Sequence, residues 1–307
     1  MKKNRIILLG ASKRFDSIQL LLESAKNLKV QLDIISIESD ASIPHPISEL
    51  AEVVEGPEFS SPRLEKFILD VAQGEKTLVI PFMDSAAATT SKFSNTINVH
   101  WIVSPDSVVV SDKRSMKKIA SQLGVDVVPN TPDTWPKIGK PALGFGSRGQ
   151  QILNNLNELI EFEYTQIPYV IEDYCPGPES TVDVYFSRDR QPHSIIARDR
   201  LIVESGEVIR TKTRNPNKKE LTAINAFSQL NLKGPVNFQF LSVNHNQYLM
   251  EINPRFSGGS TASIRAGWQA WDWIIQEYLL NNPITGVGFE HVEVTRSRRD
   301  HVSYYEK

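Results

Sequence analysis

The sequence reads Tyr248-Leu249-Met250-Glu251-Ile252-Asn253-Pro254-Arg255 towards its C-terminal end, and no other segment is as specific. Side chains alternate between the two faces of a strand, so Glu251 and Asn253 share one face and the apolar Met250 and Ile252 share the other. One carboxylate and one amide oxygen therefore point the same way, and oxygen ligands suit Mg2+. Alternating polar residues on an exposed strand face would give the same pattern, so the segment alone leaves both interpretations open.

The residues around this strand extend the predicted site. The segment Asn237-Phe238-Gln239-Phe240 is predicted to form the neighbouring strand, from which Gln239 would supply a third oxygen. Because Mg2+ keeps several waters and takes further oxygens from substrate phosphates, two or three protein ligands are enough. Arg255 follows Asn253 by two residues, where its guanidinium could clamp a transferring phosphoryl group.

A second segment is rich in glycine: Gly139-Lys140-Pro141-Ala142-Leu143-Gly144-Phe145-Gly146-Ser147-Arg148-Gly149. Its glycines expose backbone N–H groups, and the Ser-Arg pair could reach phosphate oxygens, which suits a flap over a phosphate chain. A glycine-rich hairpin turn explains the segment equally well, because the G-x-x-x-x-G-K-[ST] spacing of a P-loop is absent.

A third segment, Val170 to Glu179, runs from an apolar strand into two carboxylates and a Pro-Gly turn. Such a strand end can offer backbone groups to a purine edge, and Glu179 could accept the two hydroxyls of a ribose. The alternative is a solvated strand end, and the segment alone does not exclude it. Cys175 lies in this turn, and a small apolar role suits it better than a reactive thiol.

The order of predicted elements gives the fold class. Alternating strands and helices up to about residue 110 predict a doubly wound, Rossmann-like α/β domain. Residues 111–180 are predicted to form a small lobe with a glycine-rich flap, entered through a helix capped by Ser111-Asp112-Lys113. Residues 181–307 are predicted to form an α+β lobe with a largely antiparallel sheet, a helix from Glu220 to Leu230 and another from Ser260 to Leu280.

Composition restricts the possible partners. The 307 residues include 34 Lys and Arg against 36 Asp and Glu, and the formal net charge of -2 gives no electrostatic case for nucleic acid. No apolar stretch approaches the roughly 20 residues of a membrane span, so no membrane partner is expected. The single cysteine, Cys175, excludes an internal disulfide framework and indicates a cytoplasmic protein. We therefore expect small-molecule partners.

Taken together, these segments resemble the ATP-grasp superfamily, and within it the branch related to the carbamoyl-phosphate synthase large subunit. The resemblance rests on the order of Lys113, Lys140 with its glycine loop, Glu172 to Glu179, Gln239 and the Glu251 to Arg255 motif. It covers about residues 110–280. It implies a two-lobed ATP-grasp fold behind a Rossmann-like domain. It also implies ATP and Mg2+ as cofactors, with Mn2+ able to substitute, and a homodimer as a candidate assembly.

The resemblance also implies a role for each matching residue. Arg255 would be the catalytic residue that stabilises phosphoryl transfer, and the metal ligands would be Gln239, Glu251 and Asn253. Many relatives carry an acid where this chain has Gln239, which leaves the affinity for a second Mg2+ open. The ATP-binding residues would be Lys113, Lys140, Ser147, Arg148, Gly149, Glu172, Tyr174, Cys175 and Glu179.

The expected substrate site rests on fewer observations. The glycine pair Gly258-Gly259 precedes a predicted helix, whose start is either an anion site or simple helix punctuation. Asp84 follows a predicted strand of the first domain, where a doubly wound sheet binds its ligands, although it could equally cap the next helix. Together with Arg265, these residues are the predicted substrate contacts.

The resemblance implies an ATP-dependent ligase that activates a carboxylate as an acyl-phosphate for attack by an amine, like an amino acid or small-peptide ligase. The alternative is a non-catalytic, ATP-binding regulatory protein of the same fold, against which the intact Glu251, Asn253 and Arg255 argue. An NAD-dependent oxidoreductase is poorly supported, because the first turn, Gly10-Ala11-Ser12, lacks the G-x-G-x-x-G fingerprint.

Overall fold

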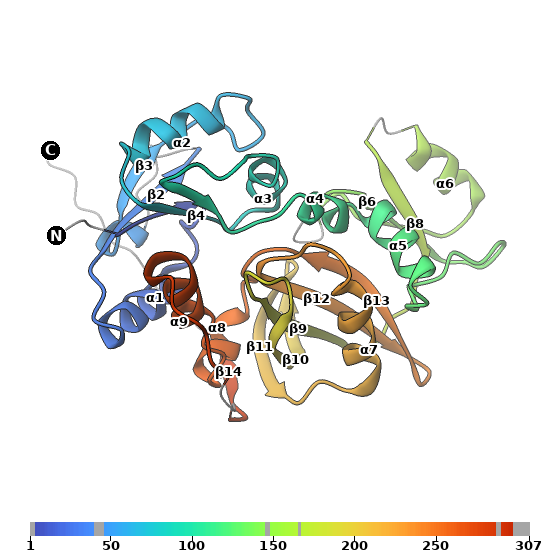
Figure 1. The fold of residues 1–307 in the computed structure, drawn as a ribbon. Coiled ribbons are helices and arrows are strands. Elements are labelled where there is room, and N and C mark those ends of the chain that lie inside the picture. Colours follow the sequence, from blue (N-terminus) through green and yellow to red (C-terminus); the bar gives the residue numbers. More distant parts are fainter. Residues whose placement is uncertain (1–3, 40–45, 145–147, 165–166, 287–289, 297–307) are drawn as a thin grey trace, which may run out of the picture.

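The computed structural model describes residues 4–39, 46–144, 148–164, 167–286 and 290–296. Three separate sheets organise this part of the chain, with five, three and six strands. Figure 1 shows the five-stranded sheet on one side of the molecule, the three-stranded sheet on the other, and the six-stranded sheet below and between them. The chain thus forms an N-terminal sheet, a small lobe and a large sheet.

The N-terminal sheet is parallel throughout, with the order β3-β2-β1-β4-β5. Alternate residues of β1 enter two different cores, because Ile6 and Leu8 belong to one cluster and Ile7 and Leu9 to another. Helices cover both faces, which explains why the strands are continuously apolar. The predicted Rossmann-like fold is confirmed. Its elements are β1 (Asn4–Leu9), α1 (Phe15–Asn27), β2 (Leu32–Glu38), a short 3-10 helix (Pro46–Glu49), β3 (Glu52–Glu55), α2 (Leu64–Ala72), β4 (Thr77–Pro81), α3 (Asp84–Thr90) and β5 (Val99–Trp101).

Two helices connect this sheet to the small lobe. They are α4 (Asp106–Ser111) and α5 (Lys113–Gln122), and the carboxylate of Asp112 caps α5 by accepting the backbone N–H groups of Arg114 and Ser115, as predicted. The small lobe itself is an antiparallel sheet of order β7-β6-β8 with one helix. Its elements are β6 (Lys137–Pro141), β7 (Gln151–Leu153), α6 (Leu156–Glu163) and β8 (Tyr169–Asp173).

The large sheet is antiparallel throughout, with the order β13-β12-β9-β10-β11-β14, so the predicted antiparallel second half is confirmed. One face packs on α7, where the side chains of Asn217 and Glu220 form a reciprocal capping box. Its elements are β9 (Glu179–Phe186), β10 (Pro192–Glu204), β11 (Glu207–Arg214), α7 (Lys218–Phe227), β12 (Gly234–Val243), β13 (Asn246–Asn253) and β14 (Glu293–Thr295).

The prediction of one helix from Ser260 to Leu280 is wrong. The structure has α8 (Ser260–Arg265), then a break, then α9 (Ala270–Ile274), which continues as a π-helix (Ile275–Leu280). Gly267 lies in the break with a backbone φ of 107°, a conformation that residues other than glycine rarely adopt. The break turns three buried tryptophans, Trp268, Trp271 and Trp273, into the core that they share with α1.

These C-terminal helices join the first sheet to the large one. In Figure 1, α8 and α9 lie beside α1, between the N-terminal sheet and the large sheet. Phe256, which follows β13, packs between Phe82 and Trp271 with ring centroids 5.8 and 4.2 Å away. Among the helices that the structure describes, none is both long and apolar enough to cross a membrane.

Candidate functional site

A polar cleft of about 440 Å³ lies between the small lobe and the large sheet. Strand ends of both lobes reach it, as do the loop after β13 and the start of α5. The cleft brings together most of the predicted site residues, which are far apart in the sequence. Those that line it are Lys113, Lys140, Glu172, Tyr174, Cys175, Glu179, Gln239, Glu251, Arg255, Gly258 and Gly259.

Two lysines hold a single buried carboxylate at the small-lobe wall. Glu172, near the end of β8, is fully buried, and its two oxygens lie 2.7 and 2.6 Å from the ammonium groups of Lys117 and Lys140. Burial lowers the pKa of Lys117, although the charge of Glu172 acts in the opposite direction. Because two cations share one anion, this wall carries a surplus positive charge, which suits a phosphate chain.

Lys113 bridges the two lobes. It is the first residue of α5, and its buried ammonium lies 3.4 Å from both the carbonyl oxygen of Gly144 and the carboxylate of Glu251. Burial by itself would raise the pKa of Glu251, but Lys113 and a hydrogen bond from Asn253 bring it below the usual range. The carboxylate is therefore ionised at neutral pH.

The oxygens predicted to bind metal lie on adjacent strands. Gln239 on β12 is the register partner of Glu251 on β13, and the amide of Asn253 donates to Glu251 over 3.0 Å. Among the described residues no group of three His, Cys, Asp or Glu side chains could hold a metal ion. One carboxylate with two amides is a weak metal site alone, but it fits Mg2+ whose other ligands are phosphate oxygens and water.

Arg255 is hydrogen-bonded to an acidic residue of helix α3. Its Nε and Nη2 each donate over 2.6 Å to one oxygen of Asp84, the first residue of α3. Burial would lower the pKa of Arg255, but Asp84 outweighs it and raises the pKa, so the guanidinium stays charged. The carboxylate of Asp84 therefore holds this arginine, while no side chain caps α3.

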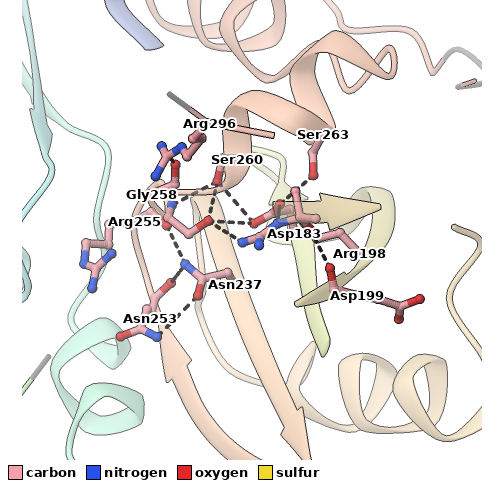
Figure 2. A network of polar contacts seen from close by, with 12 residues as sticks. Asp183, Arg198, Asp199, Asn237, Asn253, Arg255, Gly258, Ser260, Ser263 and Arg296 are labelled. Carbon is pink, nitrogen blue, oxygen red and sulfur yellow. Dashed lines mark hydrogen bonds and ion pairs between the residues drawn. The ribbon is translucent and has the colours of Figure 1, made fainter. Parts of the chain in front are cut away.

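A buried network supports the glycine loop beyond Arg255 (Figure 2). Asp183 and Arg198, each only 1% exposed in its side chain, form an ion pair of 2.9 Å at the back of the cleft. The loop and α8 supply the other hydrogen bonds of this pair: Ser260 and Ser263 donate to Asp183, and Ser257 accepts from Arg198. A side chain at Gly259 would meet Nη1 of Arg198 at 2.5 Å, so this position requires glycine.

Comparison with known proteins identifies this arrangement. The family described as "ATP-grasp in the biosynthetic pathway with Ter operon" matches residues 165–297, which include the large sheet and the Glu251 to Arg255 motif. The biotin carboxylase domain dimer of Hydrogenobacter thermophilus 2-oxoglutarate carboxylase, solved with MgADP, ADP and bicarbonate, superposes with a TM-score of 0.72. The alignment covers 92% of this chain and 71% of that one at 15% identity. The chain thus has the ATP-grasp fold, and its residues 165–297 match an ATP-grasp family.

Two further matches are informative. The L-amino acid ligase of Bacillus licheniformis superposes on this chain with a TM-score of 0.68 at 15% identity, covering 90% of this chain and 74% of that one. The carbamoyl phosphate synthase large chain of Thermoanaerobacter pseudethanolicus is 26% identical over 181 residues. That match covers 54% of this chain but only 16% of the much longer relative, so the predicted similarity to this branch is confirmed and distant.

Several predicted residues of the chain have surroundings that the sequence did not indicate. Glu179 forms an ion pair of 2.9 Å with Arg200 on β10. Burial and then the nearby Asp173 and Glu172 raise the pKa of the Cys175 thiol, which suits a small apolar role. The backbone N–H of Tyr174 donates to Pro136 over 3.0 Å and fixes this segment against the loop before β6.

The other predicted residues that the structure describes do not line the cleft, and Asn253 meets it only through its hydrogen bond to Glu251. Ser147 lies outside the described residues, whereas Arg148 and Gly149 are exposed and do not line the cleft. Asp84 reaches the site only through Arg255. Arg265 instead lines a second pocket, between α1 and the break after α8, together with Trp271 and Asp272. The structure therefore does not bring Arg265 to the predicted substrate site.

Sequence reasoning missed several residues that this site contains. Lys117 follows Lys113 by four residues on α5, so helical periodicity could have placed both on one face. Asp183, Arg198 and Arg200 lie inside strands, where nothing local separates a functional charge from an ordinary one. Arg14, in the turn before α1, also lines the cleft.

Proposed function

We propose that this protein is an ATP-dependent ligase that activates a carboxylate as an acyl-phosphate and transfers the acyl group to an amine. The observation that carries the proposal is the convergence of Lys113, Glu251 and Arg255 in the cleft that also contains the Lys140–Glu172 pair. These groups are charged and fixed by hydrogen bonds, which is what phosphoryl transfer requires of a protein.

The cleft suggests how ATP would lie. The adenine would meet the backbone of Tyr174 and Cys175, and the ribose would lie near Glu179, after release or sharing of Arg200. The phosphates would then extend past Lys140, where two lysines share the carboxylate of Glu172, towards Lys113 and Glu251. Glu251, Asn253 and Gln239 would hold Mg2+, which neutralises phosphate charge when it is bound.

The proposed reaction needs no nucleophilic side chain. A carboxylate oxygen of the substrate attacks the γ-phosphorus, the bond to the β–γ bridging oxygen breaks, and ADP leaves. The amine nitrogen then attacks the acyl carbon, inorganic phosphate leaves, and the nitrogen loses a proton. Arg255 would stabilise the charge on the transferred phosphoryl group, while Asp84 keeps its planar fork in position.

The test is substrate-dependent release of ADP and phosphate from ATP and Mg2+, across pooled amino acids, small carboxylates and amines. Glu251→Ala should abolish release, because it removes the one carboxylate of the proposed metal site, whereas the exposed Glu161→Ala should retain it. Release that persists in Glu251→Ala would contradict the assignment of the site.

The same experiment separates the regulatory alternative. Tight binding of ATP without turnover in any pool would favour a non-catalytic ATP-binding protein. A failure to bind ATP at all would refute both functions.

A further inference from the structure

One cation of the cleft has no part in the proposed ATP site. Arg14 lies in the turn between β1 and α1 of the N-terminal part of the chain. Its side chain nevertheless reaches the loop that follows Arg255. Its Nη1 lies 3.2 Å from the position that a Cβ of Gly258 would occupy. Because Gly258 has no side chain, the guanidinium of Arg14 can lie directly against this loop, and Arg14 lines the cleft.

The guanidinium of Arg14 is only loosely paired with an acid. Asp84 is taken up by Arg255 through two bonds of 2.6 Å, and Arg296 donates to the backbone carbonyl of Gly258 rather than to an acid. In the part of the chain that the structure describes, the acid within 4.0 Å of Arg14 is Glu207, at 3.7 Å, and half of its side chain is exposed to water. Glu251 and Asp16 also act on Arg255 and Arg296, so Arg14 is the arginine of this group whose acidic partner is both distant and exposed.

Burial disfavours the charged form of this loosely paired arginine. The side chain of Arg14 is only 15% exposed. Burial, and then the neighbouring Arg255, lower its pKa to about 10. A guanidinium kept where its charge is disfavoured is stabilised when an anion binds next to it.

A second buried arginine, Arg198, adds positive charge beside the glycine loop. Nη1 of Arg198 has no hydrogen-bond partner among the described residues, although Nε and Nη2 of the same group are bonded to Asp183 and Ser257. It packs against Gly259, one residue from the loop atom that Arg14 approaches. Arg14 and Nη1 of Arg198 thus lie against the same glycine pair of the cleft, Gly258-Gly259.

We propose that Arg14 binds a second anionic group of the substrate, so that the acid activated beside Arg255 carries two anionic groups. This inference rests on the proposed function. The second group is a carboxylate or a phosphate, since both match the donor fork of an arginine. A monocarboxylic acid would leave Arg14 without its anion.

The test compares acids that differ only in the second charge. The pairs are glutamate and glutamine, succinate and succinamate, and 3-phosphoglycerate and glycerate. Their binding is measured by calorimetry with Mg2+ and the non-hydrolysable analogue β,γ-imido-ATP, and their turnover by ADP release. In each pair of acids that the protein binds, the acid with the second negative charge should bind about 10- to 100-fold more tightly than its partner. The third pair separates a phosphate from a carboxylate.

Three variants assign the preference to Arg14. Arg14→Gln should remove it without changing the affinity for the ATP analogue. Glu207→Gln should strengthen dianion binding, because it removes the acid that competes for Arg14; a merely structural role for Arg14 would not produce this opposite sign. Arg210→Gln removes an exposed arginine outside the cleft and should change nothing. If Arg14→Gln does not fold, Arg14→Lys with Glu207→Gln carries the test.

The outcomes distinguish this inference from the proposed function. Dianion binding that is lost in Arg14→Gln but gives no ADP release supports the inference and refutes the ligase. ADP release with monoanionic acids that is insensitive to Arg14→Gln supports the ligase and overturns the inference. If no dianionic member binds more tightly than its partner, the inference is also overturned.

Discussion

Arg255 and Asp84 are 171 residues apart in the sequence and meet through two short hydrogen bonds. Arg255→Lys would keep the charge but lose the planar fork that Asp84 orients. We expect the kcat of ADP release to fall about 100-fold, with little change in the KM for ATP. Steady-state kinetics checks this, with Arg210→Lys as the control outside the cleft; an unchanged kcat would show that the fork has no catalytic role.

Cys175 gives a prediction with a pH dependence. Its thiol pKa is raised, by burial first and then by Asp173 and Glu172, so the reactive thiolate is scarcer at neutral pH than in a free thiol. Alkylation by iodoacetamide should therefore be slower than that of glutathione at pH 7 and keep rising with pH beyond the range in which glutathione levels off. Cys175→Ala should keep the proposed ligase activity. Fast alkylation at pH 7 would contradict this environment.

At the scale of single residues, the sequence predicted the parts of the site that local patterns encode. Glu251 and Asn253 follow from strand alternation, and Asp112 follows from capping chemistry. The partners of these residues did not follow, because pairs such as Lys117–Glu172 and Glu179–Arg200 join different elements. A single sequence contains no local trace of such contacts.

The loop between β13 and α8 illustrates a constraint at the scale of an element. In Gly259→Ala the new Cβ would lie 2.5 Å from Nη1 of Arg198 and 2.7 Å from the side chain of Val208, both in a packed interior. We expect a loss of about 1–3 kcal/mol in the free energy of unfolding. Urea denaturation measures it. Gly144→Ala is the matched control, since its Cβ would come no nearer than 3.5 Å to Pro141, and an equal loss there would contradict the packing argument.

Elements with strong periodicity were predicted well, and those set by tertiary contacts were not. The apolar run of β1 and the strands of the large sheet follow from the sequence alone. The break near Gly267 did not, because one glycine is tolerated inside a helical pattern. β14 is a three-residue edge strand with polar neighbours, and only pairing with β11 defines it.

At the scale of the whole molecule, the tryptophans of the C-terminal helices connect its parts. Trp271 is fully buried and packs against Phe256 and Phe82. Trp271→Ala should cost about 3–5 kcal/mol of unfolding free energy, because the cavity would open in the core shared with α1. Chemical denaturation followed by circular dichroism checks this.

Tyr164→Ala is the control for that experiment, since the side chain of Tyr164 is 81% exposed and its loss should change stability by less than about 0.5 kcal/mol. Equal losses in both variants would contradict a shared core. The division of the chain at residues 110 and 180 stays a prediction, which limited proteolysis would test.

The shared core has a consequence for synthesis of the protein. Ile6 and Leu8 of β1 belong to the same cluster as Trp271 and Ile274 of α9. A ribosome delivers β1 long before α9, so this apolar cluster lacks the part of its cover that α9 supplies until that helix has been made. The nascent chain is therefore a client for chaperones that bind exposed apolar surface, and a premature stop before α9 would leave an aggregation-prone fragment.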